Sequence, residues 1–398
     1  MWIERQIGPR LQRLAATRPV LVLSGARQTG KTALMRRLFA AHHYVSLDLP
    51  SEAAQAEQDP AAFLARHPLP LVVDEVQYAP GLFRHLKSVV DGDRLATGQL
   101  ILTGSQPFAL MQGIAESLAG RAAVVQLEGL SSIEVAEAAP DLSLAERLLR
   151  GGYPELIAQP AIDATEYFSS YVATYLERDL RSQLQVTNLR DFERFLRAVA
   201  LRSAQLLNRA ELARDVGISN STAGIWLALL ERSGLVVLLE PWFSNATKRL
   251  VKAPKLYVAD TGLLAFLVGL RSAPELLASP LVGALWETHV LMDLRRQAAA
   301  AGDPLVLHFW RDRSKEVDLV VQRGGRYWLA DAKWSELPQP ADARRLPQVA
   351  AELGTEAVAA QALICRTPNS YPLGNGVDAL PLGEACAWLG IKPAATRG

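Results

Sequence analysis

The feature that most constrains this chain is a glycine-rich stretch at residues 25–32. An apolar run at 19–23 precedes it, and apolar residues at helical spacing follow it in 33–39. A buried strand that leads through a tight loop into a helix turns backbone N–H groups and the helix N-terminus toward a phosphate. The spacing is that of a phosphate-binding loop, in the residues Gly25-Ala26-Arg27-Gln28-Thr29-Gly30-Lys31-Thr32.

The loop predicts an ATP site with magnesium. Lys31 would place a point charge on the β- and γ-phosphates, and the hydroxyl of Thr32 would hold Mg²⁺. The whole segment from Gly25 to Thr32 is therefore expected to bind the nucleotide. The alternative is a glycine turn that carries a surface lysine.

Two further apolar runs end in polar residues. Residues 69–73 lead into Asp74 and Glu75, and residues 99–102 lead into Thr103, Gly104 and Ser105. We expect Asp74 to orient a Mg²⁺-bound water and Glu75 to polarise the attacking water as a general base. Ser105 would contact the γ-phosphate or that water. Taken alone, the carboxylates would be solvated strand-end residues and the last run an ordinary strand and turn.

These three segments resemble the AAA-superfamily (AAA+) ATPases. With Ser117-Leu118-Ala119-Gly120-Arg121 and Gly151-Gly152-Tyr153-Pro154, nearly the whole chain is similar to a prokaryotic family of uncharacterised ATP-binding proteins. The resemblance implies hydrolysis of ATP to ADP and phosphate. It also places Arg121 where an arginine finger acts on the γ-phosphate in cis or in trans, and a finger in trans would require a homo-oligomer. The alternative is a structural arginine at a helix end.

The predicted fold class is α/β, with several domains in 398 residues. Residues 1–128 would form a P-loop AAA-type core with a parallel sheet, and 129–188 its helical lid. Residues 189–256 would form a winged helix, and 257–398 a linker and an α/β restriction-endonuclease-like domain. Aromatic residues in the lid, such as Phe168 and Tyr171, are interpreted as packing rather than ligand binding.

Composition limits the partners. The 42 Lys and Arg residues nearly balance 41 Asp and Glu residues, so a nucleic acid would have to meet a local basic surface. The N-terminus lacks the apolar region of a signal peptide and no stretch reaches 18 apolar residues, which predicts a cytoplasmic protein without a membrane partner. The two cysteines are expected to be reduced thiols.

The winged-helix prediction rests on a helix-turn-helix bend at Gly217, followed by a recognition helix that opens at residues 220–222. Residues 245–249 would form the wing. DNA would be held by phosphate contacts from Arg214, Lys248, Arg249, Lys252 and Lys255. The alternative is a packing module with a solvated basic surface.

A second chemical group lies near the C-terminus. Glu287 falls in a helical pattern, Asp318 on a strand, and Asp331 and Lys333 at the end of the next strand. This order resembles the restriction-endonuclease-like nuclease core. Asp318 and Asp331 would coordinate Mg²⁺, with Glu287 as an additional acidic ligand, while Lys333 would stabilise developing charge or activate water. Many domains of this fold keep the architecture without the activity, so the alternative is a domain that only binds.

The leading hypothesis is an ATP-hydrolysing AAA-type protein that couples nucleotide state to nucleic-acid handling, including metal-dependent DNA cleavage. The alternative is an ATP-dependent regulatory or signalling switch whose C-terminal domain binds a protein partner. A small-molecule kinase is a third class, disfavoured by the adjacent Asp74 and Glu75 and by the long C-terminal half.

Overall fold

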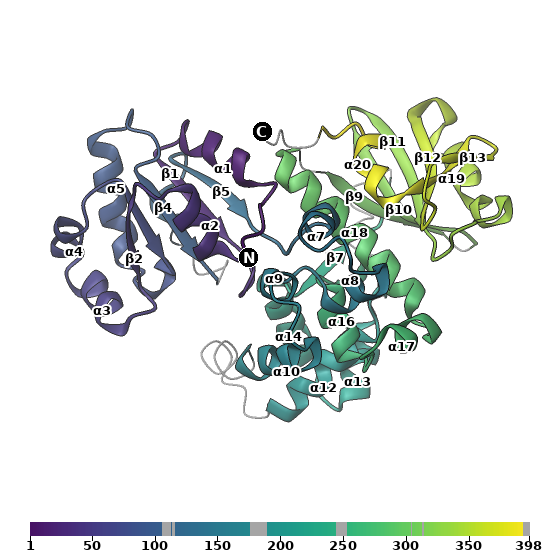
Figure 1. Ribbon diagram of the computed structural model, residues 1–398, viewed down its shortest axis with the longest axis horizontal. Coiled ribbons are helices and arrows are strands. Elements are labelled where there is room, and N and C mark those ends of the chain that lie inside the picture. The colour runs from purple at the N-terminus through teal and green to yellow at the C-terminus, as the bar shows by residue number, and fades with distance from the viewer. Residues whose placement is uncertain are drawn as a thin grey trace.

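The computed structural model describes residues 1–105, 113, 116–175, 189–243, 253–303, 305–312 and 314–392. Figure 1 shows an N-terminal sheet on one side, a C-terminal sheet on the other, and a group of helices between and below them. Among the helices within these ranges, none is long and apolar enough to cross a membrane.

The N-terminal sheet is parallel, as the sequence predicts. Its strand order is β2-β3-β4-β1-β5. The two strands β1 and β4 are buried at every residue, which is why they read as continuous apolar runs. The carboxyl ends of β1, β3 and β4 meet at one edge of the sheet. The strands are β1 (Val20–Ser24), β2 (His43–Ser46), β3 (Leu71–Asp74), β4 (Leu100–Gly104) and β5 (Ala122–Gln126).

Helices cover both faces of this sheet. Alternate strand residues face opposite ways, so Val22 and Leu102 pack with Phe63 and Phe83 on one face, whereas Leu23 packs with the helices of the other face. The helices of this part are α1 (Gly8–Ala15), α2 (Lys31–Leu38), α3 (Pro50–Gln58), α4 (Pro60–Arg66), η1 (Val76–Tyr78) and α5 (Leu82–Gly92).

The helical middle shares a single core. Buried side chains from the predicted lid, such as Phe168, join those of the predicted winged helix, such as Trp226, and of the following segment, such as Phe266. The helices are α7 (Ser132–Ala138), α8 (Leu144–Arg150), α9 (Pro154–Ala158), α10 (Ala164–Tyr175), α12 (Leu189–Ala200), α13 (Arg209–Val216), α14 (Asn220–Arg232), α16 (Thr261–Leu267) and α17 (Ala273–Ala278).

A three-stranded antiparallel sheet, in the order β6-β8-β7, accompanies α13 and α14. The turn between these helices contains Gly217 at φ 83°, a left-handed conformation that suits glycine. The expected wing at 245–249 lies outside the described residues, so the winged-helix assignment stays a prediction. The strands are β6 (Gln205–Leu206), β7 (Val236–Leu239) and β8 (Lys255–Val258).

The C-terminal domain is a six-stranded mixed sheet in the order β13-β14-β12-β11-β10-β9. Its strands are β9 (Val306–Arg311), β10 (Glu316–Arg323), β11 (Arg326–Ala332), β12 (Val358–Cys365), β13 (Tyr371–Gly374) and β14 (Val377–Pro381). Its helices are α18 (Val282–Ala301), α19 (Arg345–Leu353) and α20 (Ala385–Trp388), with the 3₁₀ turns η3 (Pro340–Ala343), η4 (Thr355–Ala357) and η5 (Leu382–Glu384). The restriction-endonuclease-like assignment stays a prediction.

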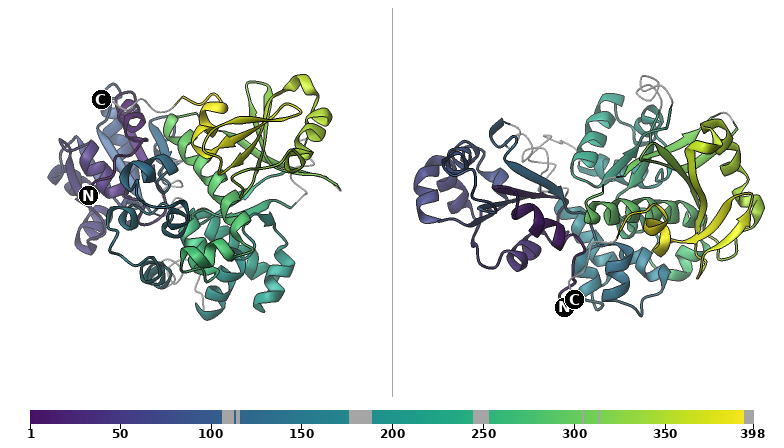
Figure 2. Two further views of the ribbon diagram at one scale, coloured as in Figure 1. Left: turned by 45° about the vertical axis from the view of Figure 1, so that its right-hand side comes forward. Right: turned by 90° about the horizontal axis from the view of Figure 1, so that it is seen from above.

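Helix α18 links the two ends of the molecule. One face packs against the C-terminal sheet, while Ala300 near its C-terminus joins the core beneath the N-terminal sheet. Both views of Figure 2 show this long helix running between the C-terminal sheet and the rest of the chain. The residues after β7 also join the C-terminal sheet, because the N–H of Trp242 donates to the carbonyl of Phe309 at 2.7 Å.

Candidate functional site

The phosphate loop has the backbone that its glycines predict. Gly25 lies at φ 152° and Gly30 at φ 89°, and a Cβ on Gly25 would collide with the carbonyl oxygen of Leu127. Helix α2 begins at Lys31, so its N-terminal N–H groups face the loop. The ammonium of Lys31 donates to the carbonyl oxygens of Gly25 at 3.0 Å and Ala26 at 2.8 Å.

Asp74, at the end of β3, accepts hydrogen bonds from three hydroxyl groups. Its Oδ2 accepts from Thr32 at 2.8 Å and from Tyr44 at 2.7 Å, and its Oδ1 accepts from Thr103. The structure therefore brings Thr32 and Asp74 together as predicted. Tyr44 and Thr103 were not predicted as site residues. Thr103 directly follows the apolar run 99–102, which was the available signal for it, whereas Tyr44 lies within β2 and no motif marks it.

Glu75 faces the end of β4. Its Oε2 accepts from the N–H and hydroxyl of Ser105 at 3.0 and 2.8 Å, and from the amide of Gln77. Burial raises the pKa of Glu75, but the hydrogen bonds from Gln77 and Ser105 and the charge of Lys31 outweigh burial, so the pKa is lowered. The carboxylate is therefore ionised at neutral pH, in contact with the predicted Ser105.

A pocket of about 420 Å³ lies against the phosphate loop. This volume is in the range of small-molecule sites. Its lining includes Lys31, Thr32 and Glu75 from the core, and Tyr171 and Thr174 from α10. The hydroxyl of Tyr167, also on α10, donates to Gln28 at 2.7 Å. Helix α10 thus forms one side of the pocket, and Tyr171 both packs in the helical core and lines the site.

Arg121 is not at this pocket. It precedes β5, whose first residue pairs with Val20 at the start of β1, whereas the phosphate loop follows the other end of β1. Its guanidinium binds Asp91 at 2.8 and 3.0 Å. An arginine finger within one chain is inconsistent with this position. A finger supplied to a second copy stays a prediction.

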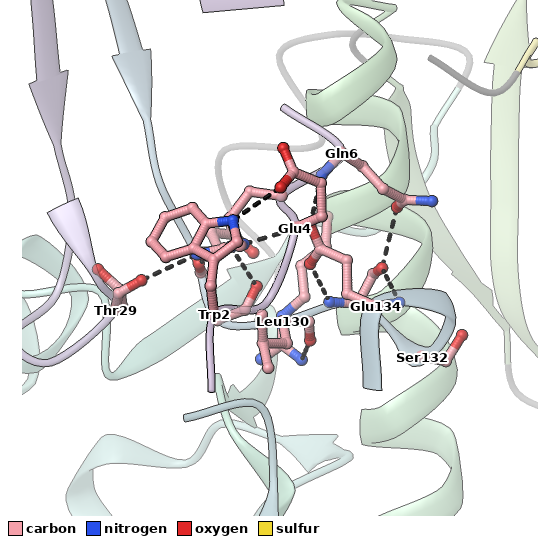
Figure 3. A network of polar contacts seen from close by, with 12 residues as sticks. Trp2, Glu4, Gln6, Thr29, Leu130, Ser132 and Glu134 are labelled. Atoms are coloured by element: carbon pink, nitrogen blue, oxygen red, sulfur yellow. Dashed lines mark hydrogen bonds and ion pairs between the residues drawn. The ribbon is translucent and has the colours of Figure 1, made fainter. Parts of the chain in front are cut away.

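A buried arginine joins the phosphate loop to the segment after β5. Arg5 is 6% exposed and donates to the carbonyls of Thr29 and Glu128, each at 2.9 Å. Its Nε contacts the carboxylate of Glu134 at 3.2 Å, which also accepts from the N–H of Gln6 at 2.6 Å. Figure 3 shows Thr29, Gln6 and Glu134 in this network.

The same segment is held by α18. Asp293, fully buried, accepts from the N–H and hydroxyl of Ser132 at 2.6 and 2.7 Å. One turn of helix further on, Arg296 donates to the carbonyl of Leu130 at 3.0 Å. Sequence reasoning missed Arg5 and Asp293, because a single charged residue in a helical or N-terminal pattern is usually on the surface.

The predicted acidic residues of the C-terminal domain do come together, but around a lysine. The ammonium of Lys255 lies 3.0 Å from Glu287, 2.6 Å from Glu316 and 3.1 Å from Asp318. Asp331 is adjacent, and its carboxylate accepts from the N–H of Asp318 at 2.9 Å. Within the described ranges, no group of three or more His, Cys, Asp or Glu residues is arranged to hold a metal ion.

Burial and mutual repulsion shape the protonation of this cluster. Burial and the charge of Asp318 raise the pKa of Glu287 to about 7, and the same two causes raise that of Asp331. Burial lowers the pKa of Lys255, but the carboxylates of Asp318, Glu287 and Glu316 outweigh burial and raise it. Lys255 is therefore a buried cation.

Two lysine predictions need correction. Lys333 binds Asp342 at 2.9 Å with a side chain 49% exposed, because the carboxylate of Asp342 on η3 offers its ammonium an ion-pair partner near the surface. Lys255 is buried and cannot contact a DNA phosphate. Of the other predicted phosphate contacts, Arg214 is exposed on α13, whereas Lys248, Arg249 and Lys252 lie outside the described residues.

A match to a known protein family supports the interpretation of the N-terminal phosphate loop and sheet. Residues 17–136 match the family model of an AAA domain. Two domains of unknown function match the rest, DUF8612 over residues 141–273 and DUF4143 over residues 282–385. The parallel sheet, the phosphate loop and the first of these matches define the N-terminal part as an AAA-type ATPase domain.

The whole chain has relatives in mycobacteria. It belongs to the family of the uncharacterized protein Rv2008c of Mycobacterium tuberculosis, to which it is 34% identical over 391 residues, covering 96% of this chain and 85% of that protein. The uncharacterized protein Mb2031c of Mycobacterium bovis matches with the same values.

Among solved structures, the Walker-type ATPase PABY2304 of Pyrococcus abyssi is similar, with 18% identity, a TM-score of 0.46, and coverage of 67% of this chain and 96% of that one. The RuvB Holliday junction branch migration motor of Thermotoga maritima aligns with 16% identity and a TM-score of 0.31, over 61% of this chain and 93% of that one.

Proposed function

We propose that this chain binds ATP with Mg²⁺, hydrolyses it to ADP and phosphate, and uses the nucleotide state as a switch between its ATPase core and its C-terminal domain. The observation that carries the proposal is a pocket lined by Lys31, Thr32 and Glu75 and bordered by α10. Behind the lining, Asp74 accepts from Thr32 and Ser105 donates to Glu75. These are the groups that phosphoryl transfer to water requires.

Each residue has a distinct role in this proposal. When ATP binds, the ammonium of Lys31 would donate to phosphate oxygens in place of the carbonyl oxygens of Gly25 and Ala26. The hydroxyl of Thr32 and the carboxylate of Asp74, 2.8 Å apart, offer the oxygen ligands that Mg²⁺ prefers, and the bound ion would neutralise charge between the β- and γ-phosphates. Glu75 accepts a proton from the attacking water, with Ser105 beside it.

The switch follows from the contacts around the loop. Thr29 in the loop is joined through Arg5 to Glu134, and the neighbouring Ser132 is bound by Asp293 of α18. A change at the phosphate loop would therefore reach the C-terminal domain through hydrogen bonds between buried groups. In this proposal the C-terminal domain binds a protein partner, because the lysine among its acids does not favour metal-dependent cleavage.

Two substitutions test the ATPase role. Lys31→Ala should abolish binding of a fluorescent ATP analogue, because the phosphates lose their fixed cation. Glu75→Gln should bind the analogue normally but lower kcat about 10²-fold or more, the usual contribution of a general base. Glu356→Gln, an exposed glutamate of the C-terminal domain, is the matched control. Normal turnover in Glu75→Gln would exclude that residue as the base.

Nucleic-acid handling is the second candidate, and the helix pair α13 and α14 favours it. Against it, residues 220–231 of α14 contain no Lys or Arg, so phosphate contacts would have to come from elsewhere. If this function holds, single- or double-stranded DNA at low salt should raise the rate of ATP turnover, measured by phosphate release. An unchanged rate at low salt, where such contacts are strongest, would argue against it.

A further inference from the structure

The acidic cluster of the C-terminal domain is filled by a side chain from another part of the fold. Lys255 comes from β8, in the three-stranded sheet of the helical middle. Along β8, Leu256 and Val258 face the helical core, whereas Lys255 and Tyr257 project to the other side. There Tyr257 donates to Glu287 at 2.6 Å, and Lys255 reaches three carboxylates.

The position of the ammonium is fixed. The side chain of Lys255 is 1% exposed, and its backbone pairs with Leu206 of β6 and Leu239 of β7. Phe309 covers it, with the ring centre 5.7 Å from Nζ. Moving this ammonium out of the site would break its three ion pairs.

We propose that Lys255 is the cation of this site: its ammonium, held by Glu287, Glu316 and Asp318, takes the place of a divalent metal ion and excludes one. A metal bound by the same oxygens would lie about 2.0–2.6 Å from them, within the space that Nζ occupies. The charge that carboxylates of this arrangement require is thus supplied by the chain itself, and the C-terminal domain has no metal-dependent hydrolytic chemistry.

Removing the ammonium should convert the cluster into a metal site. In Lys255→Met the carboxylates keep their positions but lose their cation, so a hard divalent ion becomes the partner that offsets their repulsion. Lys333→Met is the matched control, because Lys333 binds Asp342 at the surface and its loss leaves the cluster unchanged.

The experiment measures Mn²⁺ binding to the full-length protein by calorimetry, without nucleotide. Asp74→Asn is present in every variant to remove the phosphate-loop ion. We expect no uptake in this background or with Lys333→Met, one equivalent with Lys255→Met, and loss of that equivalent when Asp318→Asn is added. Mn²⁺ should also raise the unfolding temperature of the Lys255→Met protein and leave that of the background protein unchanged.

Either of two results would overturn the proposal. One is failure of the folded Lys255→Met protein to bind Mn²⁺. The other is measured in protein that keeps Lys255. If this protein takes up Mn²⁺, or cleaves plasmid DNA with Mn²⁺, and Asp318→Asn abolishes that uptake or cleavage, the proposal is wrong. The second holds even where Lys255→Met does not fold, and neither depends on the ATPase activity.

Discussion

At the scale of single residues, Tyr44 contributes a hydrogen bond to Asp74 that none of the sequence motifs contains. It lies on β2, outside the three segments that carry the phosphate-site motifs, yet its hydroxyl shares Oδ2 of Asp74 with Thr32. A carboxylate held by several donors keeps one orientation, and this orientation sets the hydroxyl of Thr32 where Mg²⁺ would bind. Tyr44 is therefore a positioning residue for the proposed ATPase.

Tyr44→Phe tests this role. Loss of one hydrogen bond to a charged group costs about 1.5–3 kcal/mol, part of which would appear as weaker Mg²⁺ binding. We expect the Mg²⁺ concentration for half-maximal ATP turnover to rise several-fold, with kcat at saturating Mg²⁺ little changed. Tyr371→Phe, on β13, removes a hydroxyl far from the loop and is the control. A lower unfolding temperature with an unaltered Mg²⁺ dependence would reduce Tyr44 to a structural role.

At the scale of elements, the sequence predicted the strands and their polar end residues better than the contacts between distant segments. The parallel sheet follows from buried apolar runs. Their polar ends meet because the carboxyl ends of parallel strands share an edge, so the proximity of Glu75 and Ser105, 2.8 Å apart, was predictable. Arg121 was placed by resemblance, and only the strand pairing of β5 with β1 shows that it lies at the far edge.

Contacts between distant motifs illustrate the same limit. The segment Gly151-Gly152 belongs to a motif that the sequence shows, but nothing in the sequence joins it to Asp260. In the structure, Asp260 caps α16 through the N–H of Gly262 at 2.9 Å and also accepts from the N–H of Gly152 at 2.7 Å. A Cβ on Gly151 would collide with the carboxylate of Asp260. The glycine is required by a residue over a hundred positions away.

The sequence also failed to predict which cation reaches the acidic cluster, for a related reason. Alternation along a strand predicts that Asp331 and Lys333 share a face, but the long side chain of Lys333 pairs with Asp342 near the surface instead of joining the acids. The cation that does reach the acids comes from a strand that the sequence assigns to another domain. No spacing rule connects Lys255 to Glu287, Glu316 and Asp318, because the connection is made by packing between sheets.

At the scale of the whole molecule, α18 is the element through which the proposed switch would act. It contributes Glu287 to the acidic cluster, and further along it contributes Asp293 and Arg296 to the segment that follows β5. A rigid helix that is bound at both places moves as a unit. A nucleotide-dependent change near Ser132 would therefore be transmitted to the C-terminal domain.

Asp293→Asn should separate nucleotide binding from this response. The buried carboxylate accepts two hydrogen bonds from Ser132 and one from Gln297 at 2.7 Å, and an amide can satisfy them only in part. We expect the free energy of unfolding to fall by about 1–3 kcal/mol, ATP affinity to be retained, and α18 to lose any ATP-dependent change in hydrogen exchange over residues 282–301.

The control is Asp303→Asn, just beyond the end of α18, where the aspartate pairs with Arg323 and is 38% exposed. Both variants are compared in the Glu75→Gln background, so that ATP stays bound during the exchange measurement. If ATP changes the exchange of α18 in the Asp293→Asn protein as much as in the control, the signal reaches the C-terminal domain by another route. The contact between Ser132 and α18 then has only a structural role, because the response to ATP would persist without the hydrogen bonds that Asp293 makes to Ser132.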